Sequence, residues 1–332
     1  MKAIVQERFG PPDVLRAAEI ESPTAGPGQV LVRVRAAAVN PYDWHLLRGD
    51  PYVARLLGGV GLTRPRSRVA GIDAAGEVAA VGAGVAGLRP GDEVLGFCPG
   101  AFAEFACTTP ELLVPKPAGP TGLTFEEAAA LPMAAVTALR GIRTVGRAEA
   151  GQRVLVNGAG GGTGTFAVQI AVDLGAEVTA VCSARNAELV RSLGAAHVVD
   201  YTREDFTGRG ERYDLILDNV GGRPLHRLRR ALAPRGTLVA NGGGSPGHVF
   251  GAMGSMLRVV AADPFVRQRL RPLVPSVPNG PVHQDLLAVT ALVEAGRLAP
   301  VVDRTYPLAD TAAAVRHVEQ GHARGKAVIS VA

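Results

Sequence analysis

Apolar and polar side chains alternate along the first third of the chain, which is typical of β structure. Residues 29–36 follow the two-residue period of a strand with one buried face. Further short apolar runs between glycines and prolines predict strands at 75–81, 88–96, 101–108 and 111–115. Short strands with this punctuation predict a small barrel-like domain.

The pattern changes at residue 124. Thr124 followed three residues later by Glu127 is a capping box, which predicts a helix start and an alanine-rich helical stretch to residue 145. Beyond residue 151, strands and helices alternate, and this order predicts a doubly wound parallel sheet. The predicted strands are 153–157, 177–182, 197–200, 214–218 and 237–240, and the predicted helices are 164–174, 186–193 and 223–232.

The end of the chain is too short to form a domain of its own. Its pattern predicts a helix at 283–295, a strand at 301–306, a helix at 309–320 and a strand at 326–331. We expect this segment to fold back onto the first third. The predicted domains are therefore 1–124 with 280–332, and 125–279.

Composition and charge exclude several classes of protein. A chain of 332 residues that is 47% hydrophobic can bury a large core and is not disordered as a whole. The 35 basic and 30 acidic side chains give a net charge of +5, but the arginines are scattered and lack interleaved aromatic rings. We therefore expect no nucleic-acid partner.

Targeting and redox signals indicate a cytoplasmic protein. The N-terminus has no apolar signal core, and no apolar run reaches the roughly 18 residues of a membrane span. The three cysteines are Cys98, Cys107 and Cys182, an odd number whose spacing matches no disulfide framework. A reducing compartment and no membrane association are the expectation.

A glycine-rich turn between a predicted strand and a predicted helix indicates a dinucleotide site. A pyrophosphate requires a tight turn, close backbone approach and the free N–H groups of a helix N-terminus. The expected cofactor contacts here are Gly158, Gly161, Gly162, Thr163 and Gly164. The alternative is a flexible glycine loop without a ligand.

The end of the next predicted strand indicates which dinucleotide is bound. A site that prefers NAD places a carboxylate there for the ribose hydroxyl groups, whereas this chain has Ser183 and Arg185. A guanidinium suits the 2′-phosphate of NADPH through charge-assisted hydrogen bonds. We therefore predict NADPH. The alternatives are that Arg185 is only a solvated helix-start residue, and that Arg203 or Tyr201 holds the phosphate.

Motifs throughout the chain resemble the medium-chain dehydrogenase/reductase superfamily. They lie at 38–44, 71–76, 90–94, 158–164, 218–222 and 321–326. The chain is most similar to the zinc-free quinone oxidoreductase branch. The alcohol dehydrogenase branch has a cysteine where Asn40 stands, and a Gly-His-Glu motif where Gly71, Ile72 and Asp73 stand. The resemblance implies an α/β protein with a GroES-like β-barrel domain, a Rossmann doubly wound parallel sheet domain, and an active site between them.

The residues themselves also argue against a metal. The cysteines and the seven histidines form no ligand cluster, so no bound zinc is expected. Without a Lewis acid, hydride must go to an acceptor that is already electrophilic. Quinones and α,β-unsaturated carbonyls fit, because hydrogen-bond donors can stabilise the negative charge on their oxygen.

The resemblance also implies which residues surround the nicotinamide and the substrate. By resemblance, Asn40 stands at the former zinc-ligand place and contacts the nicotinamide or the substrate. The clustering of aromatic side chains after Asn40 adds Tyr42 and Tyr52 as expected catalytic residues, and Trp44 and His45 as expected substrate contacts, although this cluster also suits packing of the small domain. Tyr42 stands where relatives often have a small apolar residue. The remaining expected cofactor contacts are Thr137, Tyr201, Asn219, Val220, Asn241, Gly242, Gly243 and Lys326, with strand-end caps and surface charge as the alternatives.

The sequence therefore predicts an NADPH-dependent, zinc-independent reductase of quinones or α,β-unsaturated carbonyls. A carbonyl or natural-product tailoring reductase on the same scaffold remains an alternative, as does a non-catalytic NADPH-binding sensor. We also expect a homodimer that forms through an edge strand at 270–277. The prolines in that segment argue the other way, because proline removes a ladder donor.

Overall fold

The computed structural model describes residues 1–56, 61–118, 122–242, 251–273, 282–321 and 323–331. By its internal contacts the chain forms two compact units. Unit 1 consists of Met1–Val136 with Ser276–Ala332, and unit 2 consists of Thr137–Pro275. The first boundary lies twelve residues later than the sequence boundary at 124/125, because helix α3 (Phe125–Ala129) packs against strands of unit 1.

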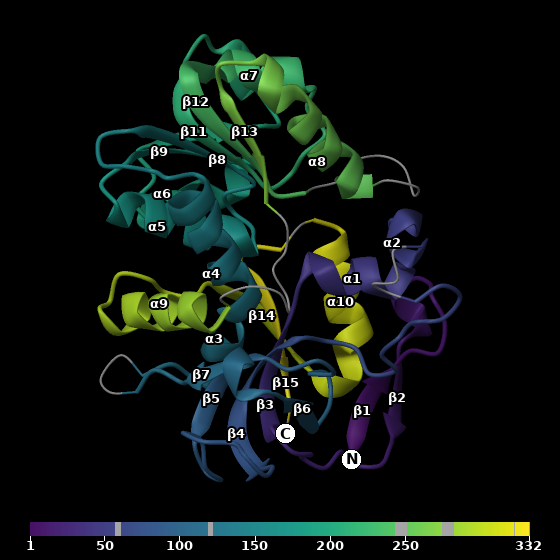
Figure 1. The fold of residues 1–332 in the computed structure, drawn as a ribbon. Helices are drawn as coiled ribbons and strands as arrows, with labels where there is room; N and C mark the ends of the chain where they lie inside the picture. Colours follow the sequence, from purple (N-terminus) through teal and green to yellow (C-terminus); the bar gives the residue numbers. More distant parts are fainter. Residues whose placement is uncertain (57–60, 119–121, 243–250, 274–281, 322, 332) are drawn as a thin grey trace. The chain divides into compact units, whose positions relative to one another are not determined.

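Unit 1 is built on a seven-stranded sheet with the order β14-β15-β3-β4-β5-β7, in which β6 also pairs with β3 (Figure 1). A two-stranded sheet of β1 and β2 lies apart from it. The strands of unit 1 are β1 (Lys2–Val5), β2 (Arg16–Glu19), β3 (Val30–Val39), β4 (Asp73–Val81), β5 (Glu93–Phe97), β6 (Phe105–Thr108), β7 (Leu113–Pro115), β14 (Val302–Pro307) and β15 (Lys326–Ser330).

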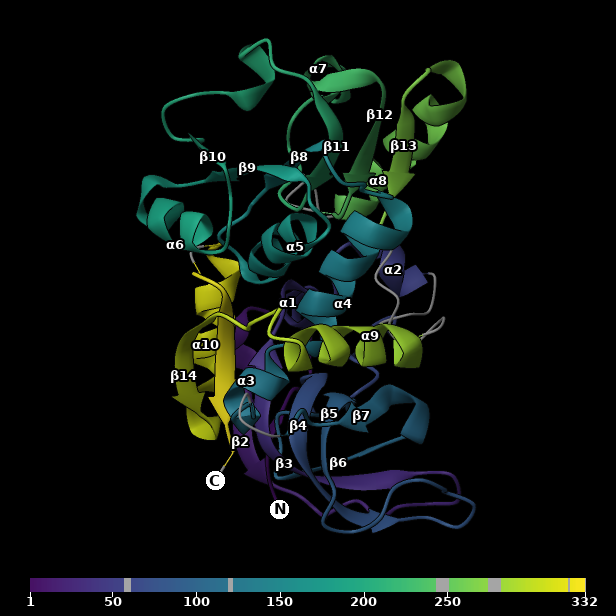
Figure 2. The same ribbon diagram turned by 90° about the vertical axis from the view of Figure 1, so that its left-hand side faces the viewer.

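The end of the chain completes the sheet of unit 1, as the sequence predicts. Strand β15 pairs antiparallel with β3, and β14 pairs parallel with β15. Helix α10 (Thr311–Glu319) packs on β15, and α9 (Val282–Glu294) packs on β7 (Figure 2). Apolar side chains from both ends of the sequence therefore share one core.

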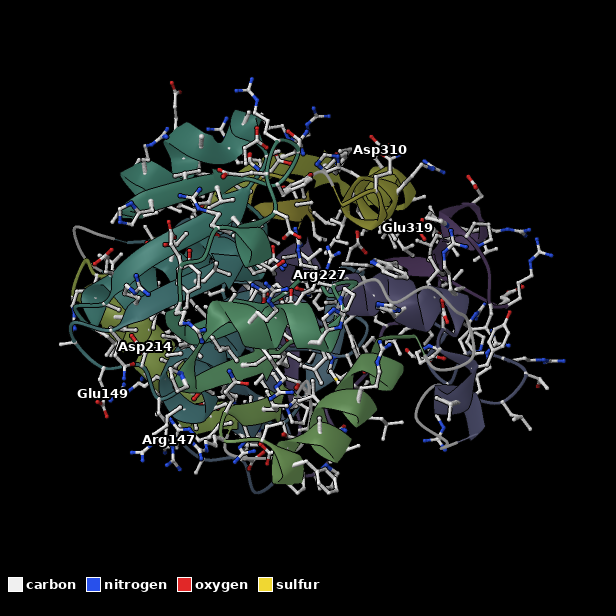
Figure 3. All side chains as sticks on the ribbon, turned by 90° about the horizontal axis from the view of Figure 1, so that it is seen from above. Arg147, Glu149, Asp214, Arg227, Asp310 and Glu319 are labelled. Atoms are coloured by element: carbon white, nitrogen blue, oxygen red, sulfur yellow. The ribbon has the colours of Figure 1, made fainter. Side chains whose placement is uncertain are left out.

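Helix α1 (Pro41–Arg48) occupies a segment for which the sequence pattern predicted no helix. Its eight residues are too few for a clear helical period, but Pro41 at its first position and Asp43 at its third are helix-start signals. An ion pair between Arg48 and Glu319 joins α1 to α10; Figure 3 labels Glu319. A second short helix, α2 (Tyr52–Leu56), follows.

Unit 2 is a doubly wound parallel sheet with the strand order β10-β9-β8-β11-β12-β13. Helices α5 and α6 cover one face, and α7 and α8 cover the other (Figures 1 and 2). Its elements are α4 (Pro132–Leu139, which crosses the boundary), a π-helix (Arg140–Val145), β8 (Arg153–Asn157), α5 (Gly162–Asp173), β9 (Glu177–Cys182), α6 (Ala187–Ser192), β10 (His197–Asp200), β11 (Tyr213–Asp218), α7 (Leu225–Ala231), β12 (Leu232–Ala240), α8 (Gly251–Ala262) and β13 (Arg269–Pro272).

The strands of unit 2 match the sequence prediction closely, with informative exceptions. Asp214 in β11 accepts a hydrogen bond from the backbone N–H of Arg153 at 2.9 Å, which fixes the register of β11 and β8 (Figure 3). Strand β12 begins five residues before the expected 237, directly after α7, and α8 was not predicted. The expected edge strand exists as β13, but residues 274–277 lie outside the described residues. Within the described ranges, no helix is long and apolar enough to cross a membrane.

Candidate active site

Three neighbouring strands of unit 1 bring polar side chains together at one edge of the sheet. Asn40 directly follows β3, Asp73 begins β4, and Lys326 begins β15. The antiparallel register pairs Val39 with Ala327 and Ala38 with Asp73. Residues from the start and the end of the sequence therefore meet, and we call Asn40, Asp43, Asp73 and Lys326 the strand-edge cluster.

Hydrogen bonds connect the members of the strand-edge cluster directly. The ammonium of Lys326 donates to Asn40 Oδ1 at 2.5 Å and to the carbonyl oxygen of Val39 at 3.2 Å. Asn40 Nδ2 in turn donates to Asp73 Oδ2 at 3.0 Å, and Lys326 Nζ lies 3.7 Å from the same oxygen. Asn40, Asp73 and Lys326 are 2%, 0% and 3% exposed. The amide of Asn40 is thus engaged at both ends.

Burial dominates the electrostatics of this cluster. It raises the pKa of Asp73 and lowers the pKa of Lys326, in both cases against the attraction between the two groups. Asp73 Oδ2 also accepts the backbone N–H of Met133 at 3.2 Å, whereas its buried Oδ1 has no hydrogen-bond partner among the described residues. The buried charge of the Asp73 carboxylate is therefore stabilised by a few fixed groups: the Asn40 amide, the Met133 N–H and the Lys326 ammonium.

Asp43 brings a second carboxyl group into the cluster. Its Oδ2 accepts the backbone N–H of Asn40 at 2.7 Å, which ties it to the start of α1. Burial raises the pKa of Asp43 to about 7, and the charge of Asp73 adds to this shift. Burial, with a contribution from Asp43, also raises the pKa of the neighbouring Tyr42 hydroxyl. Tyr42 is therefore a protonated hydrogen-bond donor at neutral pH.

Tyr42 and Asp43 line a pocket of about 220 Å³ within unit 1. Apolar side chains make up most of its wall, and Arg66 and Gln6 contribute polar groups. The full lining is Gln6, Tyr42, Asp43, Leu46, Pro65, Arg66, Ser67, Val69, Ala70, Gly71, Ile72, Phe97, Pro99, Gly100 and Leu112. The pocket joins an apolar space to a phenol donor and a buried carboxyl group.

The other predicted substrate and catalytic residues do not line this pocket. The rings of Trp44 and His45 stack with centroids 3.6 Å apart, and Trp44 packs against the core of unit 1. Tyr52 on α2 is 48% exposed, with the guanidinium of Arg55 4.7 Å from its ring centre. Of the five predicted catalytic and substrate-binding residues, the structure brings Asn40 and Tyr42 together around Asp43.

In unit 2, the glycine-rich turn connects β8 to α5 with the shape a dinucleotide requires. Gly158 has a φ of +77°, which favours glycine. A Cβ on Gly164 would lie 2.1 Å from the carbonyl oxygen of Gly158, so the helix packs closer to the turn than any side chain permits. Gly161 is the N-cap of α5, and a Cβ there would lie 3.6 Å from its nearest neighbour, the carbonyl oxygen of Gly158. The protein therefore leaves open space beside Gly161. The turn, with Gly162 and Thr163 opening the helix, fits a pyrophosphate.

The carboxyl ends of β8, β11 and β12 carry a network of amide and carboxylate side chains. Asn157 Nδ2 donates to Asp218 Oδ1 at 2.7 Å, and that oxygen also accepts the N–H of Val220 at 3.2 Å. Asn241 Nδ2 donates to Asn219 Oδ1 at 2.7 Å. Sequence reasoning missed Asn157 and Asp218 as parts of this edge, although a buried polar residue at a strand end is a recognisable signal.

The remaining predicted cofactor residues are placed unevenly. Thr137 begins unit 2 on α4 and is half-buried, and Gly242 follows β12 with a φ of +79°. Gly243 lies outside the described residues. The ammonium of Lys326, which the sequence predicts to contact the cofactor, lies in the strand-edge cluster of unit 1.

Comparisons with known proteins agree with this architecture. A family described as alcohol dehydrogenase GroES-like domain matches residues 26–118, and one described as zinc-binding dehydrogenase matches residues 193–329. The mitochondrial NAD(P)H oxidoreductase RTN4IP1 of Mus musculus is 34% identical over 376 residues, covering 100% of this chain and 89% of its own length. The chloroplast envelope quinone oxidoreductase homolog of Arabidopsis thaliana is 31% identical, covering 95% and 93%.

Two solved structures are similar along the whole chain. The quinone oxidoreductase from Coxiella burnetii has a TM-score of 0.85 at 29% identity and covers 100% of this chain and 99% of its own. The CurK enoyl reductase has a TM-score of 0.85 at 26% identity, with the same coverage. The chain belongs to the medium-chain dehydrogenase/reductase superfamily, in its quinone oxidoreductase branch. This member of the superfamily is an oxidoreductase that uses a nicotinamide cofactor.

One matching family is described as zinc-binding, but in this oxidoreductase the strand-edge residues already bind one another. Asn40 Oδ1 already accepts from Lys326, and the ammonium lies beside Asp73. Among the described residues, no three His, Cys, Asp or Glu side chains are grouped to hold a metal ion. The residues of this edge do not fit zinc.

The end of β9 in the oxidoreductase holds the residues predicted to contact the 2′ position of the cofactor. Ser183 follows β9 directly, and Arg185 lies exposed in a short 3₁₀ helix, Ala184–Asn186. The N–H of Tyr201 donates to the carbonyl oxygen of Cys182 at 3.2 Å, which brings this half-exposed ring to the same strand end. Asp200, which the prediction overlooked, is nearby, but Thr202 donates to its carboxylate through both its N–H and its hydroxyl.

Proposed function

We propose that the chain is an NADPH-dependent, zinc-independent reductase that transfers hydride to a quinone or an α,β-unsaturated carbonyl. The observation that carries this proposal is the ammonium of Lys326, 2.5 Å from Asn40 Oδ1 and 3.7 Å from Asp73 Oδ2. By resemblance, Asn40 stands where the alcohol dehydrogenase branch has a cysteine zinc ligand, and Ile72 and Asp73 stand where that branch has the His and Glu of its Gly-His-Glu motif. Here the protein's own cation takes that place.

Because the residues of this edge do not fit zinc, the proposed reaction requires acceptors that need no Lewis acid. When bound, the nicotinamide cofactor supplies the hydride. Quinones and enones accept it without a metal because the electron pair delocalises onto their oxygen. The Tyr42 hydroxyl, kept protonated by its raised pKa, donates a hydrogen bond to that oxygen in the pocket. The resemblance to an enoyl reductase supports enones over unactivated ketones.

The preference for NADPH is supported by the chemistry at the end of β9. Ser183, Arg185 and Tyr201 offer two hydroxyl groups and a guanidinium. The nearby carboxylate of Asp200 accepts hydrogen bonds from Thr202 and from the N–H of Ala184, which lower its pKa and keep it ionised. A dianionic 2′-phosphate would therefore meet the donors of Ser183, Arg185 and Tyr201 together with this one negative charge.

Steady-state kinetics with an acceptor panel tests the proposal. Purified protein is assayed with NADPH and NADH against naphthoquinone, benzylideneacetone, benzaldehyde and acetophenone, with elemental analysis and a chelator control. We expect turnover with the first two acceptors, unchanged by chelator and without stoichiometric zinc. Reduction of the simple carbonyls alone, or one tightly bound zinc per chain, would contradict it.

A further inference from the structure

The pocket of unit 1 contains two polar groups that the proposed function does not use. Gln6 is 6% exposed and lines the pocket. Its side-chain amide makes no hydrogen bond within the part of the chain that the structure describes. Its amide nitrogen and oxygen are not among the fully buried unpartnered atoms of the described residues, so they are accessible rather than sealed in the core. The amide of Gln6 can therefore hydrogen-bond to a polar group of a ligand in this pocket.

Arg66 is the second unused group. Asp43 and Arg66 are the two charged residues among the described lining of the pocket. Asp43 is tied to the N–H of Asn40, whereas Arg66 forms no ion pair with any residue that the structure describes. The nearby Arg68, in contrast, pairs with Glu7 at 3.5 Å. The guanidinium of Arg66 is available for an anion.

Backbone pairing holds the segment of Arg66 beside Gln6. Val5 and Val69 form an antiparallel bridge, and the N–H of Gln6 donates to the carbonyl oxygen of Arg68 at 2.8 Å. Ser67 Oγ donates to the carbonyl oxygen of Val69 at 2.6 Å, which further orders the segment. One wall of the pocket thus carries Gln6 and Arg66, and helix α1 supplies Tyr42 and Asp43.

We propose that the pocket selects a hydride acceptor with an apolar body of one or two rings and an acidic group at one end, with Arg66 pairing the acidic group and Gln6 donating to it. The volume of about 220 Å³ lies below the roughly 300–1,000 Å³ of sites for larger ligands, so the body is small. The carboxyl group of Asp43 disfavours an anion beside it, which directs the acidic end toward Arg66 and the reacting oxygen toward Tyr42. This inference rests on the proposed function, because that function makes the ligand a hydride acceptor. The binding of such a ligand to Arg66 and Gln6 does not depend on it.

Matched acceptors and matched variants test the proposal. Benzylideneacetone and its para-carboxylate are titrated by calorimetry and assayed as substrates with wild type, Arg66→Ala, Arg66→Lys, Gln6→Leu and Arg64→Ala. Arg64 is the control, because it is exposed like Arg66 and lies two residues away, but does not line the pocket. We expect Arg66→Ala to raise the Kd and KM of the carboxylate about tenfold at low salt with little change in kcat. Arg66→Lys should restore part of this loss, and Gln6→Leu should give a smaller one.

The neutral enone provides the decisive contrast. Its Kd and KM should change far less in Arg66→Ala than those of the carboxylate do, and should be the same in wild type and Arg64→Ala. Equal binding of both enones by wild type, or equal effects of Arg66→Ala and Arg64→Ala on the carboxylate, would overturn the proposal. Arg66-dependent binding of the carboxylate without any reduction would instead leave this site standing and remove the proposed function. Reduction of both enones without dependence on Arg66 would support the proposed function and overturn the Arg66 site.

Discussion

Lys326 and Asn40 lie 286 positions apart in the sequence, and the ammonium of one donates to the amide oxygen of the other at 2.5 Å. The contact exists because β15 pairs antiparallel with β3, so that the start of one strand meets the end of the other. Asp73 enters from β4 on the other side of β3. A three-residue polar bridge of this kind joins the two ends of the chain inside one core.

Removing the cation from this bridge should destabilise the protein strongly. Lys326→Met leaves the Asp73 carboxylate, 0% exposed, without its counter-charge, and breaking a buried pair costs about 3–5 kcal/mol. Urea unfolding followed by circular dichroism measures the change. Adding Asp73→Asn to Lys326→Met should recover part of the loss, and Lys2→Met on the surface should have little effect. A Lys326→Met protein as stable as wild type would show that the pair contributes nothing.

The buried carboxyl group of Asp43 should make stability depend on pH. Its pKa in the folded protein is about 7, above the ordinary 3.8, so between these values the native state binds more protons than the unfolded chain. Its contribution to stability therefore falls as pH rises through that window. Relative to wild type, Asp43→Asn should gain about 2–3 kcal/mol between pH 5 and pH 8. Parallel pH dependence of the two proteins in urea unfolding would contradict this.

Two glycines of the dinucleotide turn should respond differently to an added methyl group. In Gly164→Ala the new Cβ would lie 2.1 Å from the carbonyl oxygen of Gly158, so the turn must distort and the melting temperature should fall. In Gly161→Ala the nearest atom is 3.6 Å away, so the fold should survive. The methyl group then obstructs the approach of the pyrophosphate, and the Kd for NADPH should rise at least tenfold. Thermal unfolding and cofactor titration of both variants test the contrast.

Cofactor choice should depend on Arg185. A charged hydrogen bond contributes about 1.5–3 kcal/mol, so Arg185→Ala should raise the KM for NADPH on the order of tenfold to a hundredfold and leave the KM for NADH nearly unchanged. Ser183→Asp should weaken NADPH further, because its carboxylate would face the phosphate. Arg203→Ala serves as the comparison, since Arg203 lies 3.7 Å from Asp200 and is the rival phosphate ligand. An unchanged preference for NADPH in Arg185→Ala would show that another residue holds the phosphate.

Strand β13 at the edge of the sheet of unit 2 leads us to expect a homodimer. Its unpaired edge is short, Arg269–Pro272, and ends on a proline. Light scattering at micromolar concentration should give twice the mass of 34.3 kDa. The monomer mass at that concentration would remove the expectation.

Much of the fold was readable in the sequence because its signals are local. The capping box of Thr124 and Glu127 forms as predicted, with the N–H of Glu127 3.2 Å from the Thr124 hydroxyl. Strands β8, β9 and β10 have the predicted bounds, since each is a buried apolar run followed by a turn. Helix α1 was missed because eight residues with polar and aromatic side chains show no clear period.

The sequence by itself determined the two kinds of domain, the glycine-rich turn and the residue types at the end of β9, because each depends on neighbours within a few positions. Only the tertiary structure decided that Lys326 would bind Asn40 and Asp73, and that Gln6 and Arg66 would share one pocket wall. Those meetings depend on the register of strands far apart in the chain. Register is set by packing over the whole sheet, where a shift of one residue turns each side chain to the opposite face.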